Sequence, residues 1–82
     1  MKILYFAWLR EKVGVPFEEK EIEAVTVIEL INELAQLDDK YAIIFSDLSV
    51  VRVAVDQKLV QDFKTSIKDA KEIAFFPPMT GG

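Results

Sequence analysis

The chain has 82 residues, a formal net charge of −4 and 51% hydrophobic residues, which predicts one small folded domain. It has neither cysteine nor histidine, which excludes disulfides, thiolate nucleophiles, serine triads and the usual transition-metal sites. The acidic balance argues against nucleic-acid binding, because no basic surplus can neutralise phosphates. No stretch has the length of a membrane span and no leader with a cleavage site is recognisable, so a cytoplasmic protein without membrane contact is expected.

The start of the chain predicts two strands. Residues 2–9 are apolar and bulky, which predicts a buried strand. Residues 10–13 predict a single helical turn that ends at Gly14. Residues 17–23 have the length and position of a second strand that returns beside the first.

A helix is predicted next. Thr26 and Glu29 have the spacing of a capping box, in which each side chain bonds an unpaired amide at the helix start. Apolar residues recur at helical spacing after this point: Val27, Leu30, Ile31, Leu34 and Leu37.

The second half of the chain predicts shorter elements. Residues 41–45 are an apolar cluster typical of a short helix, residues 56–58 predict a turn, and residues 63–72 are polar with Ile67 as a buried plug. Three more strands are predicted, at residues 50–55, 59–60 and 73–76.

The order of these elements predicts an α+β fold, with a mixed sheet of about five strands and one main helix packed across one face. If the first and last strands are central parallel neighbours, the helix lies in the crossover between them. That arrangement is the β-grasp of ubiquitin, one of several mixed sheets that the pattern permits. Residues 1–76 form the predicted domain, and residues 77–82 form an extended C-terminal tail.

The acidic and aromatic residues suggest different roles. The carboxylates carry no mark of catalysis, and we interpret them as a solvated acidic face: Glu18, Glu19, Glu21, Glu23, Glu29 and Glu33. Neighbouring strand residues point to opposite faces, so only one of Tyr5 and Phe6 can point at the helix. The same holds for Phe75 and Phe76. Exposed phenylalanines on the outer face predict a partner-binding patch.

The tail follows the last predicted strand directly. Its two prolines cannot continue ladder pairing and stiffen the chain, while its two glycines can thread a narrow channel. Six residues at about 3.3 Å each can reach roughly 20 Å into another protein. The reactive group delivered in this way is the terminal carboxylate, which ATP-driven adenylation would turn into an acyl donor.

The chain ends in Ile73-Ala74-Phe75-Phe76-Pro77-Pro78-Met79-Thr80-Gly81-Gly82. This ending resembles the C-terminal signature of a known family, the small subunit of molybdopterin synthase, or MoaD-type sulfur carrier. Residues similar to that family also occur at Phe6-Ala7, Arg10-Glu11, Thr26-Val27, Val55-Asp56-Gln57 and Leu59-Val60. Two positions differ from the family pattern. Asp69-Ala70-Lys71-Glu72 replaces Asp-Gly-Asp-Glu, which questions the turn geometry there, and Asp56 replaces a frequent asparagine.

The resemblance implies a ubiquitin-like β-grasp protein that is not an enzyme on its own and holds no metal or permanent cofactor. An adenylating enzyme similar to ubiquitin-activating enzymes would join AMP to Gly82 with MgATP, and a sulfur donor would convert the acyl-adenylate to a thiocarboxylate. The tail would then enter the large synthase subunit, in a heterotetramer of two carriers and two large subunits, and donate sulfur to cyclic pyranopterin monophosphate. The implied partner-binding residues are Phe6, Leu59, Phe76, Pro77, Pro78, Met79, Thr80 and Gly81.

Three alternatives stay open. The first is a sulfur carrier of another pathway, such as thiamine or cysteine synthesis. The second is a ubiquitin-like modifier that is joined to lysines, and the third is a passive protein-binding module. A thiocarboxylate on the free tail, higher-mass conjugates, or function without the last glycine would distinguish them.

Overall fold

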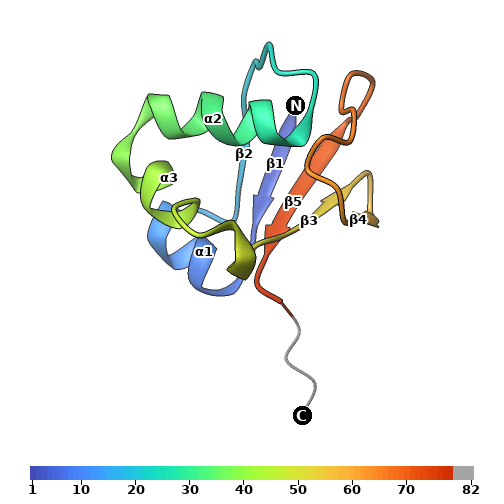
Figure 1. The fold of residues 1–82 in the computed structure, drawn as a ribbon. Helices are drawn as coiled ribbons and strands as arrows, with labels where there is room; N and C mark the ends of the chain where they lie inside the picture. Colours follow the sequence, from blue (N-terminus) through green and yellow to red (C-terminus); the bar gives the residue numbers. More distant parts are fainter. Residues whose placement is uncertain (79–82) are drawn as a thin grey trace.

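The structure is a computed structural model that describes residues 1–78 (Figure 1). Its centre is a five-stranded mixed sheet in the order β2-β1-β5-β3-β4. β1 and β5 are parallel neighbours, and the other pairs are antiparallel. The predicted α+β arrangement, with the first and last strands adjacent and parallel, is confirmed. The strands are β1 (Lys2–Tyr5), β2 (Phe17–Glu19), β3 (Arg52–Val55), β4 (Lys58–Val60) and β5 (Glu72–Phe76).

Within residues 1–78, three helices and one 3-10 turn lie in the connections of the sheet. α2 and α3 pack against each other over one face, and α1 contacts β1, β5 and α3 at the end where the chain leaves β5 (Figure 1). No helix within residues 1–78 is both long and apolar enough to cross a membrane. The helical elements are α1 (Ala7–Val13), α2 (Val27–Leu37), α3 (Asp39–Ile44) and η1 (Leu48–Val50).

The main helix, α2, begins at the predicted cap. The Thr26 Oγ1 accepts a hydrogen bond from the Glu29 N–H at 3.3 Å. The Glu29 Oε1 accepts from the Val25 N–H at 3.2 Å, one residue before the position that a standard capping box uses. Leu37 is 59% exposed, so its predicted place on the buried face is wrong, because α2 ends at this residue. The other four apolar residues are buried: Val27, Leu30, Ile31 and Leu34.

The first predicted strand is too long and its helical turn too short. The Phe6 N–H still donates to the Phe75 carbonyl at 3.1 Å, but Ala7 has a φ of 54° and turns the chain into α1. α1 buries Leu9 and Val13, four residues apart, which is helical spacing. An apolar run of this length fits a strand or a buried helix equally well, so periodicity could not place the boundary.

Two other strands are shorter than predicted because side chains bind the neighbouring backbone. β2 ends at Glu19 instead of residue 23, and the loop after it is held by carboxylates of α2. β3 begins at Arg52 instead of residue 50. The Asp47 Oδ1 accepts from the Ser49 N–H at 3.0 Å, which starts η1 over part of the predicted strand. Local bonds of this kind compete with ladder pairing.

The turn between β3 and β4 is confirmed. Asp56 and Gln57 have φ values of 48° and 71°, as a tight two-residue hairpin turn requires. The Asp56 Oδ1 accepts from the N–H groups of Lys71 and Glu72, both at 2.9 Å, and so ties this turn to the start of β5. Ala70 is not among the residues with positive φ, so this connection needs no glycine in place of Ala70.

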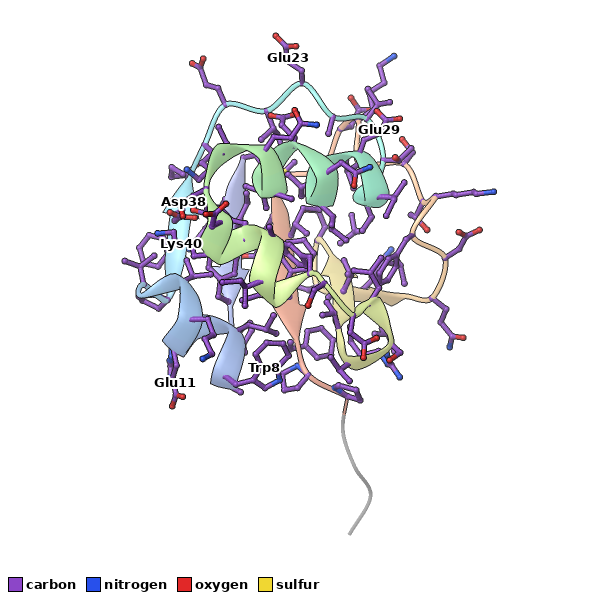
Figure 2. All side chains as sticks on the ribbon, turned by 60° about the vertical axis from the view of Figure 1, so that its left-hand side comes forward. Trp8, Glu11, Glu23, Glu29, Asp38 and Lys40 are labelled. Carbon is purple, nitrogen blue, oxygen red and sulfur yellow. The ribbon has the colours of Figure 1, made fainter. Side chains whose placement is uncertain are left out.

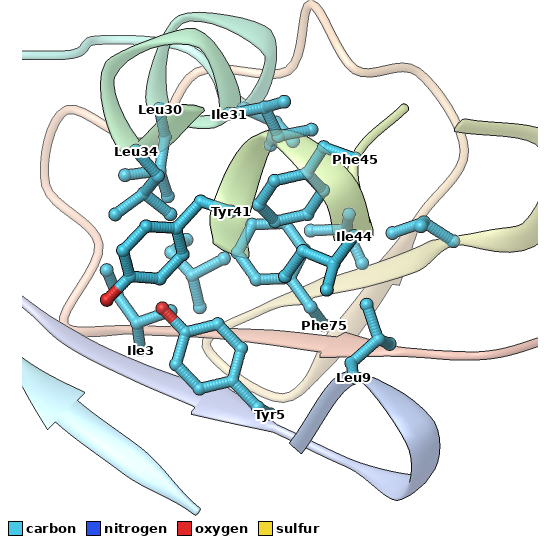
Figure 3. Close-up of a cluster of buried hydrophobic side chains, with 14 of the residues drawn as sticks. Ile3, Tyr5, Leu9, Leu30, Ile31, Leu34, Tyr41, Ile44, Phe45 and Phe75 are labelled. Atoms are coloured by element: carbon cyan, nitrogen blue, oxygen red, sulfur yellow. The ribbon is translucent and has the colours of Figure 1, made fainter. Parts of the chain in front are cut away.

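The core lies between the sheet and the helices (Figure 3). Phe75 contacts Phe45 edge to face, with ring centroids 4.8 Å apart, and Tyr5 lies 6.3 Å from Phe75. Ile67 is 2% exposed, which confirms it as a plug. The other buried side chains are Ile3, Leu9, Val13, Val27, Leu30, Ile31, Leu34, Tyr41, Ile44, Val51, Val53 and Ile73.

Candidate functional site

The outer face of the sheet, opposite α2 and α3, carries the predicted exposed aromatic residues. Tyr5 and Phe75 are 1% and 0% exposed and belong to the core. Phe6 is 44% exposed and Phe76 is half-buried, and both line a hollow on the other side of the sheet. The prediction that one member of each aromatic pair lies on the outer face is therefore confirmed.

An apolar row crosses all five strands on this outer face. Phe17 is opposite Leu4, Leu4 is opposite Ala74, Ala74 is opposite Ala54, and Ala54 is opposite Leu59. The two end residues of the row, Phe17 and Leu59, are 51% and 59% exposed. When one face of a sheet is exposed to solvent, the residues on that face are commonly polar. A continuous apolar row is therefore typical of a surface that another protein covers.

A groove of about 480 Å³ opens on this face, and we call it the outer groove. Two small side chains, Ala54 and Ala74, come from the middle strands, so bulkier neighbours rise around them. The hollow forms because methyl groups leave space that larger side chains would fill. The outer groove is lined by Phe6, Ala54, Ala74, Phe76, Pro77 and Pro78.

Four of the predicted partner-binding residues meet in the outer groove. Phe6 and Phe76 lie beside Pro77 and Pro78, which are half-buried and follow β5 directly. Leu59 is on the same face, opposite Ala54 in register, but it does not line the outer groove. The remaining predicted residues lie outside the described part of the chain: Met79, Thr80, Gly81 and Gly82.

Sequence reasoning missed three residues of this surface. Ala54 and Ala74 give the outer groove its depth, and Phe17 extends the apolar row to the edge strand. Ala74 could have been found from the sequence, because residues two apart on a strand share a face and Ala74 lies two residues before Phe76. Phe17 and Ala54 required the pairing register, which the sequence alone does not fix.

Glu18 differs from the other carboxylates because it lies in a partly buried cluster with two tyrosines. The Tyr5 hydroxyl donates to Glu18 Oε2 at 2.9 Å, and the Tyr41 hydroxyl donates to the same oxygen at 2.6 Å. Burial, followed by these bonds to Glu18, raises the pKa of both tyrosines above its ordinary value. The interpretation of Glu18 as a solvated residue is wrong, because the carboxylate joins β1, β2 and α3.

Two further carboxylates have structural tasks. The Glu33 Oε1 accepts from the N–H groups of Glu23 and Ala24 at 3.2 and 3.0 Å, and Glu29 caps α2. Figure 2 shows Glu23 and Glu29 at the end of the molecule opposite Trp8, which lies near the point where the chain leaves β5. Within residues 1–78, acidic side chains nowhere gather in a group of three that could hold a metal ion.

Comparisons with known proteins agree with this geometry. The ThiS family model matches residues 3–82. The chain is 39% identical to the molybdopterin synthase sulfur carrier subunit of Escherichia coli, over all of this chain and 99% of that protein. Among solved structures, a protein assigned as subunit 1 of the molybdopterin converting factor of Pyrococcus furiosus is 29% identical with a TM-score of 0.74, and 95% of each chain is covered.

A more distant neighbour comes from Helicobacter pylori. It is described as a complex of subunits 1 and 2 of the molybdopterin-converting factor, with 24% identity, a TM-score of 0.60 and coverage of 99% of this chain and 96% of that one. At this identity the likeness concerns the fold. The full-length family match, the high identity to sulfur carrier subunits and the shared sheet together show that the chain belongs to the ThiS family and has the ubiquitin-like β-grasp fold.

Proposed function

We propose that this protein is the sulfur carrier subunit of a molybdopterin synthase. The observation that carries the proposal is the outer groove, which lies at the base of a Phe-Phe-Pro-Pro-x-x-Gly-Gly ending. The groove supplies a docking surface, and the ending supplies a carboxylate that can enter another protein. Full-length relatives named as molybdopterin synthase sulfur carrier subunits support this assignment.

In the proposed cycle the reacting atoms of this chain belong to its main-chain end. The Gly82 carboxylate attacks the α-phosphate of ATP on an adenylating enzyme, which forms an acyl-adenylate and releases pyrophosphate. A sulfur donor then displaces AMP and leaves a thiocarboxylate. An ionised thiocarboxylate is a nucleophile without a neighbouring base, so a chain that lacks cysteine and histidine can carry sulfur. The use of ATP agrees with a cytoplasmic location.

The folded domain contributes docking and orientation. Burial of the outer face against a partner supplies an apolar driving force of about 25 cal/mol per Å² of apolar surface. Pro77 and Pro78 have fixed φ angles, so fewer conformations are lost when the tail is inserted. Docking at the outer groove thus places the start of the tail at a defined point on the partner.

The proposed partner of the charged carrier is the large synthase subunit, in a heterotetramer of two carriers and two large subunits. The Helicobacter pylori neighbour is described as a complex of two such subunits, which supports a partner of this kind. The carrier's thiocarboxylate would attack cyclic pyranopterin monophosphate and build the dithiolene of molybdopterin. Because a dithiolene needs two sulfur atoms, two carrier turnovers are required for each product.

The test is an intact-mass measurement after incubation with the adenylating enzyme, MgATP and sulfide. We expect a mass increase equal to the difference between a sulfur and an oxygen atom, and no increase when ATP is omitted. The loaded carrier should then form molybdopterin with the large subunit and the pterin precursor. An unchanged mass would reject the carrier function. Loading without molybdopterin formation would indicate a carrier of another pathway, and stable higher-mass conjugates would indicate a protein modifier.

A further inference from the structure

A second hollow, of about 430 Å³, lies between η1 and the end of β4, and we call it the η1 hollow. It shares no residue with the outer groove. Polar and apolar surface contribute about equally to its lining, and Leu59 belongs to the apolar part. Leu59 is the predicted partner-binding residue that the outer groove leaves out. The residues that line the η1 hollow include Leu48, Val51, Arg52, Leu59 and Phe63.

Arg52 is the charged residue of this hollow, and its side chain is tethered. The Arg52 Nη1 donates to the carbonyl oxygens of Ser49 and Val51, both at 3.1 Å. A guanidinium has five N–H donors, and the Nε and Nη2 groups bond no other residue within positions 1–78. In the same part of the chain, no carboxylate lies within 4.0 Å of Arg52. The chain thus presents an exposed cation, held by two backbone carbonyls and with further donors that bond no residue of positions 1–78, beside a hollow that is partly apolar.

The η1 hollow is continuous with the proposed docking face. Arg52 is opposite Phe76 in the ladder between β3 and β5, so it lies beside a residue of the outer groove. Leu59 is opposite Ala54, which lies in the floor of the outer groove. A protein that covers the outer groove and extends across β3 and β4 therefore reaches the η1 hollow as well.

We propose that the η1 hollow is a second anchoring point for the large synthase subunit. It takes a short segment of that subunit with one bulky apolar side chain and an adjacent carboxylate. The apolar side chain fills the space beside Leu48 and Phe63, and the carboxylate bonds the unused donors of Arg52. A planar guanidinium matches a carboxylate through two parallel hydrogen bonds, and tethering lowers the entropy lost on binding. This inference rests on the proposed function, because it concerns the same partner.

The experiment compares Arg52→Gln and Arg52→Lys with Lys58→Gln. Lys58 is an exposed cation on the neighbouring strand that does not line the hollow, so its substitution is a matched loss of charge. Calorimetric titration of each full-length variant with the large subunit is carried out at low and high salt. We expect Arg52→Gln to weaken binding about tenfold or more and to reduce its salt dependence. The affinity of Arg52→Lys should lie between those of Arg52→Gln and the unmodified protein. The affinity of Lys58→Gln should stay close to that of the unmodified protein.

A second measurement locates the contact without a substitution. Titration of the isotope-labelled carrier with the large subunit should shift the NMR signals of the Leu48 and Val51 methyl groups. The proposal is overturned if Arg52→Gln binds like Lys58→Gln, or if the shifts stay confined to the outer groove. It is also overturned if Arg52→Gln weakens binding of the adenylating enzyme alone. Each of these results leaves the proposed function standing, whereas no binding by the unmodified carrier would reject both.

Discussion

Adjacent aromatic residues at the end of β1 and on β5 point to opposite faces of the sheet, because side chains alternate along extended backbone and Phe6, directly after β1, is still extended. Tyr5 and Phe75 fill the core, whereas Phe6 and Phe76 face the outer groove. A substitution at one member of each pair should therefore affect stability, and a substitution at the other should affect binding.

Replacement of Phe76 by alanine tests this division at the outer groove. We expect Phe76→Ala to cost about 2–4 kcal/mol of binding to the large subunit, as for an aromatic anchor at an interface centre. Ile43→Ala is the matched control, because Ile43 is 61% exposed on α3, away from the outer face. Calorimetric titration gives the affinity, and the melting temperature reports the fold. Equal affinities of the two variants would remove Phe76 from the interface.

Because of the tyrosine cluster, the free energy of unfolding should decrease as the pH rises above 10. Tyr5 and Tyr41 are the only two tyrosines of the chain, and burial and the bonds to Glu18 raise the pKa of both. A raised pKa means that the folded state keeps the proton while the unfolded state loses it above pH 10. Each tyrosine should then lower the free energy of unfolding by about 1.4 kcal/mol per pH unit above that point.

An ultraviolet titration checks this expectation. The absorbance of tyrosinate should be absent from the folded protein near pH 10 and should appear together with loss of the fold. In urea the same chain should titrate both tyrosines near pH 10. Ionisation of either residue at pH 10 in a fully folded protein would show that the cluster with Glu18 is open to solvent.

At the scale of elements, the junction between β1 and α1 stores strain. Ala7 has a φ of 54°, a left-handed conformation that costs a residue with a Cβ about 1 kcal/mol or more. This turn places Phe6 on the outer groove while α1 starts beside it. The strained turn therefore sets the position of Phe6, a residue of the proposed docking surface.

Substitution of Ala7 should reveal this strain in both directions. Ala7→Gly should raise the free energy of unfolding by up to about 1 kcal/mol, because glycine adopts positive φ freely. Ala7→Val should lower it by more than that, since a β-branched residue tolerates this region poorly. Urea denaturation measures both changes, and Ala7 is exposed, so packing differences are small. A less stable glycine variant would contradict the strained backbone.

The segment after β5 links the fold to the tail. Pro77 and Pro78 line the outer groove, and each ring fixes its own φ and restricts the residue before it. A variant with both prolines changed to alanine should lose affinity for the large subunit, because each alanine leaves the free chain more conformations, worth roughly 0.4–1 kcal/mol per position. Stability should change by less than binding. If calorimetry and thermal melting instead show the larger loss in stability, the prolines act mainly by packing on the domain.

At the scale of the whole molecule, the proposed docking surface and the proposed reactive group belong to separate parts of the chain. The domain provides the outer face, and the proposed reactive carboxylate belongs to Gly82, six residues beyond Phe76. Changes at the last residue should therefore stop sulfur transfer without affecting the core or the docking face.

Deletion of Gly82, or addition of one residue after it, tests this separation. Deletion withdraws the carboxylate by about 3.3 Å, and about 1 Å of misplacement can cost ~10²-fold in rate. Addition caps the reactive carbonyl with a peptide bond. Both variants should bind the large subunit and inhibit the unmodified carrier competitively in a molybdopterin-formation assay. Near-normal activity of either variant alone would contradict the carrier function.

Local patterns in the sequence determined the features that depend on near neighbours along the chain. The helical spacing and cap of α2, the hairpin turn at Asp56 and the alternation of Phe75 and Phe76 follow from residues within one or two turns of each other. The same is true of the tail motif, which predicted the family. The division of residues 1–76 and 77–82 and the role of Gly82 stay predictions.

Only the tertiary structure decided the features that depend on which strands are neighbours. Ala54 and Ala74 form the floor of the outer groove because β3 lies beside β5 in one particular register. Glu18 is partly buried and hydrogen-bonded because β2 brings it to Tyr5 while α3 brings Tyr41 to the same carboxylate. Pairing between distant segments is set by the packing of the whole core. A strand's own sequence gives its alternation but not its partner, and so it could not assign these positions.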